Sequence, residues 1–287
     1  MAERAFDNVA IIGAGTMGHG IAQVCAMAGM EVRMFDLQDA ALQRGLDKVH
    51  ANLDKGVERG KVSADERDAT LIRLAGTTDL ETAVDGADLV IEAVPEKLEL
   101  KRALFSEVEA LVDDHAVLGT NTSSLSVAKI AEVLKRPEQL VGLHFFNPVH
   151  IMALLEVISH PGTVDSVIEQ IKAFGAEIGK ECIYVKDFPG FATSRLGVCL
   201  GMEAIRMLEQ GVASAADIDT AMVLGYRHPV GPLKLTDMVG LDVRLHIGEY
   251  LASELGNPAF KPPALMVEMV EAGRLGKKSG QGFYRWD

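Results

Sequence analysis

The chain has few cysteines, a shortage of positive charge and no long apolar run. Its three cysteines, Cys25, Cys182 and Cys199, are too few and too widely spaced for a disulfide framework or a zinc knuckle. No apolar stretch approaches the roughly 20 residues of a membrane-spanning helix, and no signal peptide is recognisable. We therefore expect a cytoplasmic protein that has no membrane partner and no resident metal.

Basic side chains are outnumbered, because 28 Lys and Arg residues stand against 41 Asp and Glu residues, for a net charge of −13. This balance disfavours a nucleic-acid partner, although a local basic pocket could still bind an anionic ligand. Internal repeats and low-complexity segments are also lacking. What the sequence does offer is 287 residues with 48% hydrophobic content, enough for a large core in one or two domains.

A glycine-rich turn follows the first predicted strand. The apolar run at residues 8–12 leads into Gly13-Ala14-Gly15-Thr16-Met17-Gly18, and a helix is predicted over residues 21–28. A second strand, residues 31–35, ends at Asp36. This order of strand, GxGxxG turn, helix, strand and acid is typical of Rossmann-like, dinucleotide-binding α/β domains. The predicted cofactor contacts are Gly13, Gly15, Thr16, Met17, Gly18 and Asp36.

The three glycines and the acid have separate predicted tasks. Gly13 permits the tight turn, Gly15 lets a pyrophosphate approach the backbone, and Gly18 allows the helix to pack closely on the strand. Asp36 is placed to bond the ribose 2′-hydroxyl and to repel a 2′-phosphate, which favours NAD over NADP. Arg33 lies near enough in sequence to leave NADP open. FAD is the other competitor, although no second FAD-type signature follows.

A helical excursion is predicted over residues 39–74, where it interrupts the alternation of strands and helices. Ser63 and Glu66 form a capping-box pattern, which predicts a new helix as far as about Leu74. The excursion is rich in basic side chains, namely Arg44, Lys48, Lys55, Arg59 and Lys61. These could face a phosphorylated ligand or form a solvated helix face, and the sequence leaves both open.

Polar residues follow two further predicted strands. Glu96 and Lys101 come after the strand at residues 88–94, and the cluster Asn121-Thr122-Ser123-Ser124 comes after the strand at residues 116–119. Open α/β sheets bind ligands at the carboxyl ends of their strands, so these side chains are candidates for ligand contacts. Ser123 could instead serve only as a cap for the helix predicted at residues 127–134.

The stretch His144-Phe145-Phe146-Asn147-Pro148 is followed by Glu156, which lies inside an apolar run at residues 151–158. A carboxylate in such a run is costly to desolvate unless a donor meets it, and His144 would be that donor if the two segments are neighbouring strands. A neutral imidazole oriented by a carboxylate can take a proton from an alcohol. We therefore predict that His144 and Glu156 form a catalytic pair; the alternative is a structural histidine.

Beyond about residue 187 the pattern is helical throughout. Helices are predicted over residues 195–209, 214–224, 243–255 and 264–272, and Gly197 and Gly201 are expected to let another helix approach closely. A helical bundle with this much apolar surface could form a dimer interface. Near the end of the chain, Gly276-Lys277-Lys278-Ser279-Gly280 could be a phosphate-tethering loop or a flexible tail.

Taken in order, several of these motifs resemble the L-3-hydroxyacyl-CoA dehydrogenase family, in particular its short stand-alone 3-hydroxybutyryl-CoA dehydrogenase type. The matching motifs are GAGTMGHGIAQ, VIEAVPE, NTSSL, HFFNPV, DFPGF, HPVGP and GKKSGQGFY. The resemblance implies a Rossmann-like domain at residues 1–186 with a CoA-binding helical hairpin at about 39–74. An all-α substrate and dimerisation domain would follow at 187–287. It also implies NAD-linked interconversion of (S)-3-hydroxyacyl-CoA and 3-ketoacyl-CoA by a homodimer.

The resemblance also assigns residues by motif position. His144 resembles the general base, Glu156 its orienting carboxylate, and Ser123 the residue that contacts substrate and nicotinamide. Further cofactor contacts would come from Glu96, Lys101, Asn147 and Lys278. Asn52 and Arg59 stand where members often have a serine and a lysine that bind CoA.

Ser194 departs from the family pattern, because the chain reads Thr193-Ser194-Arg195 where Val-Asn-Arg is typical. We expect Ser194 to contact the substrate and to alter acyl preference. The same chemistry on a cyclic, aromatic or dicarboxylic hydroxyacyl-CoA, or on a free hydroxy acid, is therefore the alternative. A non-catalytic nucleotide-binding structural protein is a third possibility.

Overall fold

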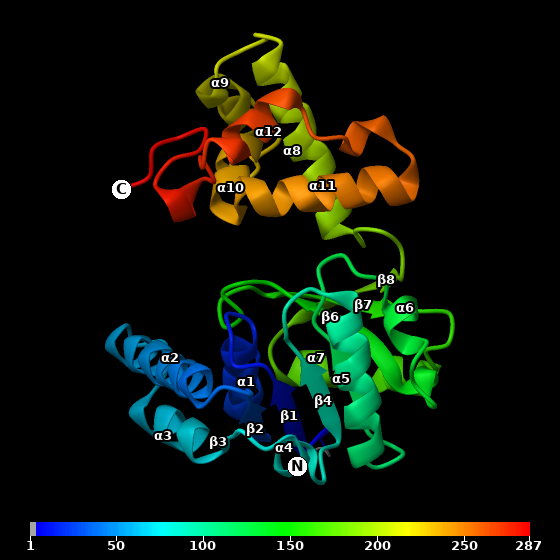
Figure 1. Cartoon of the computed structure of the whole chain (residues 1–287). Helices are drawn as coiled ribbons and strands as arrows, with labels where there is room; N and C mark the ends of the chain where they lie inside the picture. The colour runs from blue at the N-terminus through cyan, green and yellow to red at the C-terminus, as the bar shows by residue number, and fades with distance from the viewer. Residues whose placement is uncertain (1–3) are drawn as a thin grey trace. The chain divides into compact units, whose positions relative to one another are not determined.

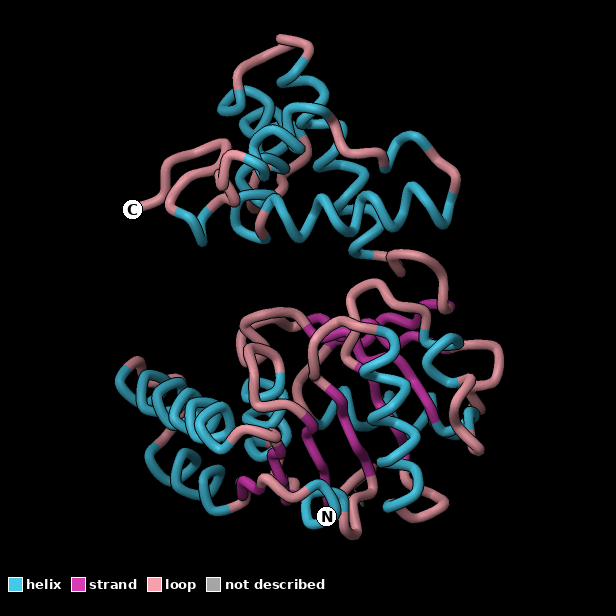
Figure 2. Tube along the Cα trace, viewed as in Figure 1, coloured by secondary structure: helices cyan, strands magenta, loops and turns pink. Residues whose placement is uncertain are grey.

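The computed structural model describes residues 4–287 (Figure 1). The chain divides into two compact units, Met1–Phe188 and Pro189–Asp287. All eight strands belong to the first unit, and the second consists of helices and loops (Figure 2). Among residues 4–287, no helix combines the length and the apolar character needed to cross a membrane.

One eight-stranded sheet organises the first unit, with the strand order β3-β2-β1-β4-β5-β6-β7-β8. Its strands are β1 (Asn8–Ile12), β2 (Glu31–Phe35), β3 (Leu74–Thr77), β4 (Leu89–Glu92), β5 (Val117–Thr120), β6 (Leu140–Phe145), β7 (Leu154–Ser159) and β8 (Glu181–Lys186). The first six strands pair in parallel, whereas β7 is antiparallel to β6 and parallel to β8. The strand order reverses between β1 and β4, the switch point at which doubly wound sheets bind dinucleotides. The predicted α/β class is confirmed.

Helices cover both faces of this sheet, so its central strands are buried on both sides. The helices are α1 (Gly18–Met27), α2 (Asp39–Glu58), α3 (Ala64–Ile72), α4 (Leu80–Val84), α5 (Leu98–Leu111), α6 (Val127–Ala131) and α7 (Asp165–Glu177), with a 3₁₀ turn η1 at Pro137–Gln139. Every residue of β4 and β5 is buried, as near-continuous apolar strands of a parallel sheet should be. Residues at the carboxyl ends of these strands are therefore held by a rigid core.

The helical excursion proves to be the crossover from β2 to β3. α2 and α3 pack against each other and against α1 (Figure 1). The predicted capping box is present: Ser63 Oγ accepts a bond from the amide of Glu66 at 3.1 Å, and the Glu66 carboxylate accepts one from the amide of Ser63 at 2.7 Å. Hence the excursion is an enlarged connection between two parallel strands and does not interrupt their alternation.

The helix predicted to end at about Leu74 ends at Ile72 as α3, and Leu74 begins the edge strand β3, which was not predicted. β3 has only four residues, and its central Ala75 and Gly76 have weak strand preference. A Cβ at Gly76 would lie 3.0 Å from a methyl carbon of Leu46, so the close packing of α2 explains the glycine.

The second unit is all-α, as predicted. Its elements are α8 (Thr193–Glu209), α9 (Ala215–Thr220), a π-helical turn η2 (Ala221–Gly225), α10 (Pro232–Val239), α11 (Leu241–Leu255), a 3₁₀ turn η3 (Pro258–Phe260), α12 (Ala264–Glu271) and a 3₁₀ turn η4 (Lys277–Ser279). Met202, Leu233 and Leu251 lie at the centre of its separate apolar core. α10 is not among the predicted helices, and the helix predicted over residues 214–224 ends in the π-helical turn.

The C-terminal segment is anchored rather than a flexible tail. The fully buried carboxylate of Asp237 accepts bonds from the amides of Phe283 and Tyr284, each at 2.9 Å, and from the indole of Trp286 at 2.8 Å. Tyr284 also donates to Asp219 at 2.7 Å. The last residues of the chain are therefore part of the folded second unit.

Candidate active site

The glycine-rich turn between β1 and α1 has the geometry that the three predicted tasks require. Gly13 has a φ of +106°, and a Cβ at Gly18 would lie 1.7 Å from the carbonyl oxygen of Gly13. A Cβ at Gly15, in contrast, would meet no protein atom within 4 Å. The turn thus needs Gly13 and Gly18 for its own fold and leaves the backbone at Gly15 open to a ligand, which fits the pyrophosphate of a dinucleotide.

Asp36 lies at the end of β2 beside this turn, where its carboxylate accepts a bond from the amide of Ala14 at 3.1 Å. Arg33 is directed elsewhere: its guanidinium donates to the carbonyl groups of Thr82, at 3.3 Å, and of Asp85, in α4 and the loop before β4. Because that loop precedes β4, it lies at the amino edge of the sheet. Arg33, which had left NADP as an alternative cofactor, therefore bonds at the edge of the sheet opposite Asp36, and the site fits NAD.

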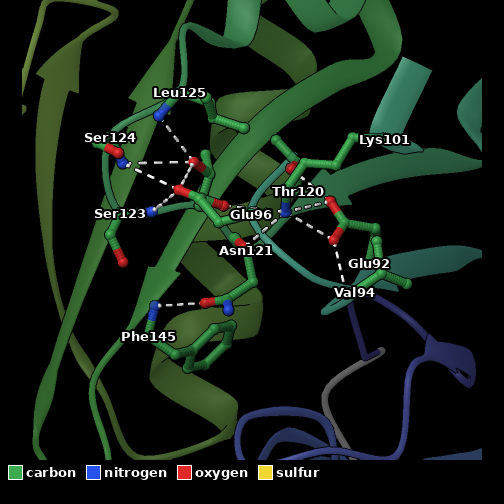
Figure 3. Close-up of polar contacts among 11 residues, drawn as sticks. Glu92, Val94, Glu96, Lys101, Thr120, Asn121, Ser123, Ser124, Leu125 and Phe145 are labelled. Atoms are coloured by element: carbon green, nitrogen blue, oxygen red, sulfur yellow. Dashed lines mark hydrogen bonds and ion pairs between the residues drawn. The ribbon is translucent and has the colours of Figure 1, made fainter. Parts of the chain in front are cut away.

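A buried ionic cluster lies under the carboxyl edge of β4 and β5 (Figure 3). Lys101 Nζ is 2.7 and 2.8 Å from the two carboxylate oxygens of Glu92 and 3.1 Å from the carbonyl oxygen of Asn121. Thr120 donates its hydroxyl to Glu92 at 2.7 Å. Lys101 and Glu92 are both fully buried, so the ammonium of Lys101 faces this cluster, and its role as a cofactor contact stays a prediction. The cluster ties α5 to the two strands.

Glu96 shapes the loop that carries Ser123 (Figure 3). One of its carboxylate oxygens accepts bonds from the Thr122 hydroxyl at 2.6 Å and from the amides of Ser123 and Ser124 at 2.9 and 3.3 Å. Its other oxygen lies 3.3 Å from Lys101 Nζ. Glu96 thus links the loop after β5 to the buried cluster.

Ser126, not Ser123, caps the helix that follows this loop. The Ser126 hydroxyl accepts from the amide of Lys129 at 3.2 Å and donates to the carboxylate of Asp187 at 2.8 Å. Ser123 is therefore not the N-cap residue of α6. Its half-buried side chain follows the carboxyl end of β5 and does not fold back to start α6.

His144 and Glu156 are cross-strand partners in the antiparallel pair β6–β7. The imidazole Nδ1 lies 2.6 Å from a carboxylate oxygen of Glu156, and both side chains are buried. The Phe146 ring packs against the imidazole, with ring centroids 4.4 Å apart. The two segments are neighbouring strands, which was the condition for His144 to be the partner of Glu156. Because a carboxylate only accepts, Nδ1 carries the proton of this bond and Nε2 is the basic nitrogen.

The other predicted residues of the first unit are spread around this edge and along α2. Asn147 is exposed in the loop after β6 and precedes Pro148 through a cis peptide bond. Asn52 is half-buried on α2, where its amide donates to Gln23 at 3.1 Å, and Arg59 is exposed at the end of that helix.

Two predicted residues belong to the second unit. Ser194 is the second residue of α8. Lys278 lies in η4 and donates to the carboxylate of Asp242 at 2.6 Å. Within residues 4–287, no group of three or more His, Cys, Asp or Glu side chains is arranged to hold a metal ion.

Sequence reasoning missed Glu92, Thr122 and the side chain of Asn121, whose oxygen accepts from the amide of Phe145 at 3.1 Å. A signal for Glu92 was available, because it is a lone carboxylate in an apolar strand, as Glu156 is. The desolvation argument that found a partner for Glu156 applies equally to Glu92.

A doubly wound sheet with an open glycine turn at its switch point, and a carboxylate-bound histidine at the same edge, defines the class of nucleotide-dependent dehydrogenases. Comparison with known families specifies this further. Residues 8–188 match the model for the NAD-binding domain of 3-hydroxyacyl-CoA dehydrogenase, and residues 190–286 match the model for its C-terminal domain. The chain belongs to the 3-hydroxyacyl-CoA dehydrogenase family.

Individual relatives match over nearly the whole chain. A 3-hydroxybutyryl-CoA dehydrogenase from Mycobacterium tuberculosis is 42% identical over 98% of this chain and 99% of its own. A 3-hydroxyadipyl-CoA dehydrogenase from Escherichia coli is 43% identical over 98% of this chain and 59% of its own. The crystal structure of (S)-3-hydroxybutyryl-CoA dehydrogenase from Ralstonia eutropha superposes with a TM-score of 0.95 at 40% identity, covering 98% of this chain and 99% of that one.

Proposed function

We propose that this protein is an NAD-dependent dehydrogenase that interconverts (S)-3-hydroxyacyl-CoA and 3-ketoacyl-CoA, with His144 as the general base. The observation that carries the proposal is the 2.6 Å bond between His144 and the fully buried Glu156. Membership of the dehydrogenase family supports the same reaction. Bound NAD would supply the hydride acceptor.

The chain's own residues would move the hydroxyl proton. His144 Nε2 accepts the proton of the C3 hydroxyl, and Glu156 stabilises the imidazolium that forms while it keeps Nδ1 protonated. The closely packed Phe146 ring restricts the rotation of the imidazole. The Ser123 hydroxyl, on the loop held by Glu96, would donate to the same substrate oxygen as charge develops there.

The cofactor contacts are proposed as follows. The turn from Gly13 to Gly18 holds the pyrophosphate at the start of α1, and Asp36 bonds the adenosine ribose. Asn147 and Glu96 lie at the carboxyl edge, where they can bond the nicotinamide end. Lys101 would act mainly through Glu96, since its ammonium is buried. Lys278 in η4 is retained as a further cofactor contact.

α2 offers a surface for the CoA nucleotide. Arg44, Lys48, Asn52, Lys55 and Arg59 are spaced by four, four, three and four residues, so they share one face of the helix. The four basic members are exposed, and they form a cationic stripe. Of the two uses left open for these side chains, we therefore propose phosphate binding, with Arg59 and Asn52 among the contacts.

The assembly and the compartment are also proposed. We propose a homodimer formed through the second unit, which exposes several large apolar side chains: Leu196, Val212, Leu224, Tyr226, Met238, Val239 and Val243. All three cysteines are free thiols, which fits a reducing cytoplasm.

The decisive assay is NADH oxidation with acetoacetyl-CoA. We expect turnover with acetoacetyl-CoA and at least about tenfold less with free acetoacetate, because the CoA contacts of α2 are then lost. NADPH in place of NADH should be a poor substrate, since Asp36 repels a 2′-phosphate. Absence of turnover with every ketoacyl-CoA would refute the proposed function.

A further inference from the structure

The connection between β6 and β7, residues 146–153, is held by the side chain of Lys180, which lies in the turn between α7 and β8. The Lys180 ammonium donates to the carbonyl oxygen of Val149 and, at 2.7 Å, to that of Met152. Burial lowers the pKa of Lys180 below its usual range, as expected for a half-buried ammonium whose acceptors are uncharged backbone groups. Its two bonds therefore fix the backbone of the connection.

Two further contacts hold the same connection in place. The amide of Glu181, the residue after Lys180, donates to the carbonyl oxygen of Ala153 at 2.8 Å. Val149 is also buried against α1, because a Cβ at Gly20 would lie 2.9 Å from the Cβ of Val149. The connection therefore contacts both the α7–β8 turn and the helix whose first turn would hold the pyrophosphate.

Two residues of the proposed active site belong to this connection. The Phe146 ring packs on the imidazole of His144, with ring centroids 4.4 Å apart, and Asn147 is a proposed nicotinamide contact. The bond between His144 and Glu156 does not depend on the connection, because the β6–β7 ladder sets their register. What the bonds of Lys180 can set is therefore the position of Phe146 and Asn147.

We propose that Lys180 is a positioning residue for hydride transfer, because it holds the connection against α1 and so places Phe146 and Asn147 relative to the dinucleotide bound at that helix. The proposal rests on the proposed function. Lys180 acts through the backbone of Val149 and Met152, so it needs no contact of its own with the reacting atoms. A shift of about 1 Å in the groups that orient a reactant can cost about 10²-fold in rate, so the loss of these two bonds should slow the chemical step.

The test replaces Lys180 by methionine, which removes both bonds and keeps an apolar stem of similar length. The rate of NADH oxidation in a single turnover with saturating acetoacetyl-CoA reports the chemical step, and per folded enzyme it should fall at least about tenfold. The KM for acetoacetyl-CoA should stay within about threefold, because the proposed CoA contacts lie on α2. Circular dichroism gives the folded fraction and the melting temperature of the same samples.

Two further variants separate the two bonds from the loss of a lysine as such. Lys180→Arg should keep the single-turnover rate within about threefold of wild type, because a guanidinium can also donate to both carbonyl groups. The side chain lines a cavity of about 350 Å³, which gives the larger head room. Lys172→Met is the matched control, since this lysine lies exposed on α7, and it should leave the rate and the KM unchanged.

A folded Lys180→Met protein with the wild-type single-turnover rate would overturn the proposal, whatever its melting temperature. A rise in KM of about tenfold at an unchanged rate would overturn it too, because Lys180 would then act in binding. If Lys180→Met does not fold, Gly20→Ala decides: its Cβ displaces Val149 while Lys180 remains, so the rate should fall, and an unchanged rate contradicts the proposal. If the wild-type protein turns over no ketoacyl-CoA, the proposed function has failed, and this proposal with it.

Discussion

Single residues are most constrained where His144 and Glu156 meet, because two buried polar groups there have to satisfy each other. Removing either side chain leaves the other buried without its hydrogen-bond partner, which is destabilising. The same logic explains the fully buried pair Glu92 and Lys101, which lies under the loop of Ser123. The two pairs differ in accessibility to a ligand, since His144 keeps a small exposed fraction and Lys101 keeps none.

His144→Ala should lower turnover of acetoacetyl-CoA by roughly 10²- to 10⁴-fold, the usual contribution of a positioned general base or acid. The affinity for NADH, measured by fluorescence titration, should stay near the wild-type value, because no cofactor contact is removed. Glu156→Gln should give a smaller loss, because the amide oxygen can still accept from Nδ1. Wild-type rates in His144→Ala would exclude this residue as the base.

Lys101→Met should lower the free energy of unfolding by about 3–5 kcal/mol, because Glu92 is left buried without its cation. Replacing both members, with Leu for Glu92 and Met for Lys101, should restore most of this loss. Urea unfolding followed by circular dichroism measures both changes. A Lys101→Met protein of normal stability that no longer binds NADH would instead support a direct cofactor contact.

At the scale of elements, the turn between β1 and α1 has one glycine that its fold requires, Gly18, and another that ligand binding requires, Gly15. Gly15→Ala should leave the melting temperature close to wild type, since its Cβ meets no protein atom, but should weaken NADH binding at least about tenfold by blocking the pyrophosphate. Gly18→Ala is the matched comparison. It should lower the melting temperature, because its Cβ would collide with the Gly13 carbonyl. Equal effects of the two changes on stability would contradict this division of tasks.

The sequence predicts those elements that depend on local patterns better than those that depend on contacts between distant residues. The GxGxxG turn, the capping box at Ser63 and the apolar central strands follow local rules, and each is found as expected. β3 escaped prediction because its four residues have little strand preference, so pairing with β2 alone makes it a strand. The buried ammonium of Lys101 is satisfied by Glu92 and by the carbonyl oxygen of Asn121, and no local pattern encodes these contacts.

For the whole molecule, the second unit should determine assembly. Met238, Val239 and Val243 surround the junction of α10 and α11 and are each more than 40% exposed. We expect light scattering to give twice the mass of one chain, and the double replacement of Val239 and Val243 by glutamate to give single chains. Ile72→Glu is the control, since this exposed apolar residue lies in the first unit, and it should leave the mass unchanged. A wild-type protein with the mass of one chain would refute the dimer.

The antiparallel pairing of β6 with β7 has a consequence for protein engineering. His144 faces Glu156 because a backbone ladder sets their register, and residues 146–153 connect the two strands. A one-residue insertion within β6 would turn His144 to the opposite face of the sheet and separate the pair. An insertion in the exposed part of the connection leaves the ladder intact. The exposed residues 150–153 are therefore a place where a new segment can be inserted while the contact between His144 and Glu156 is kept.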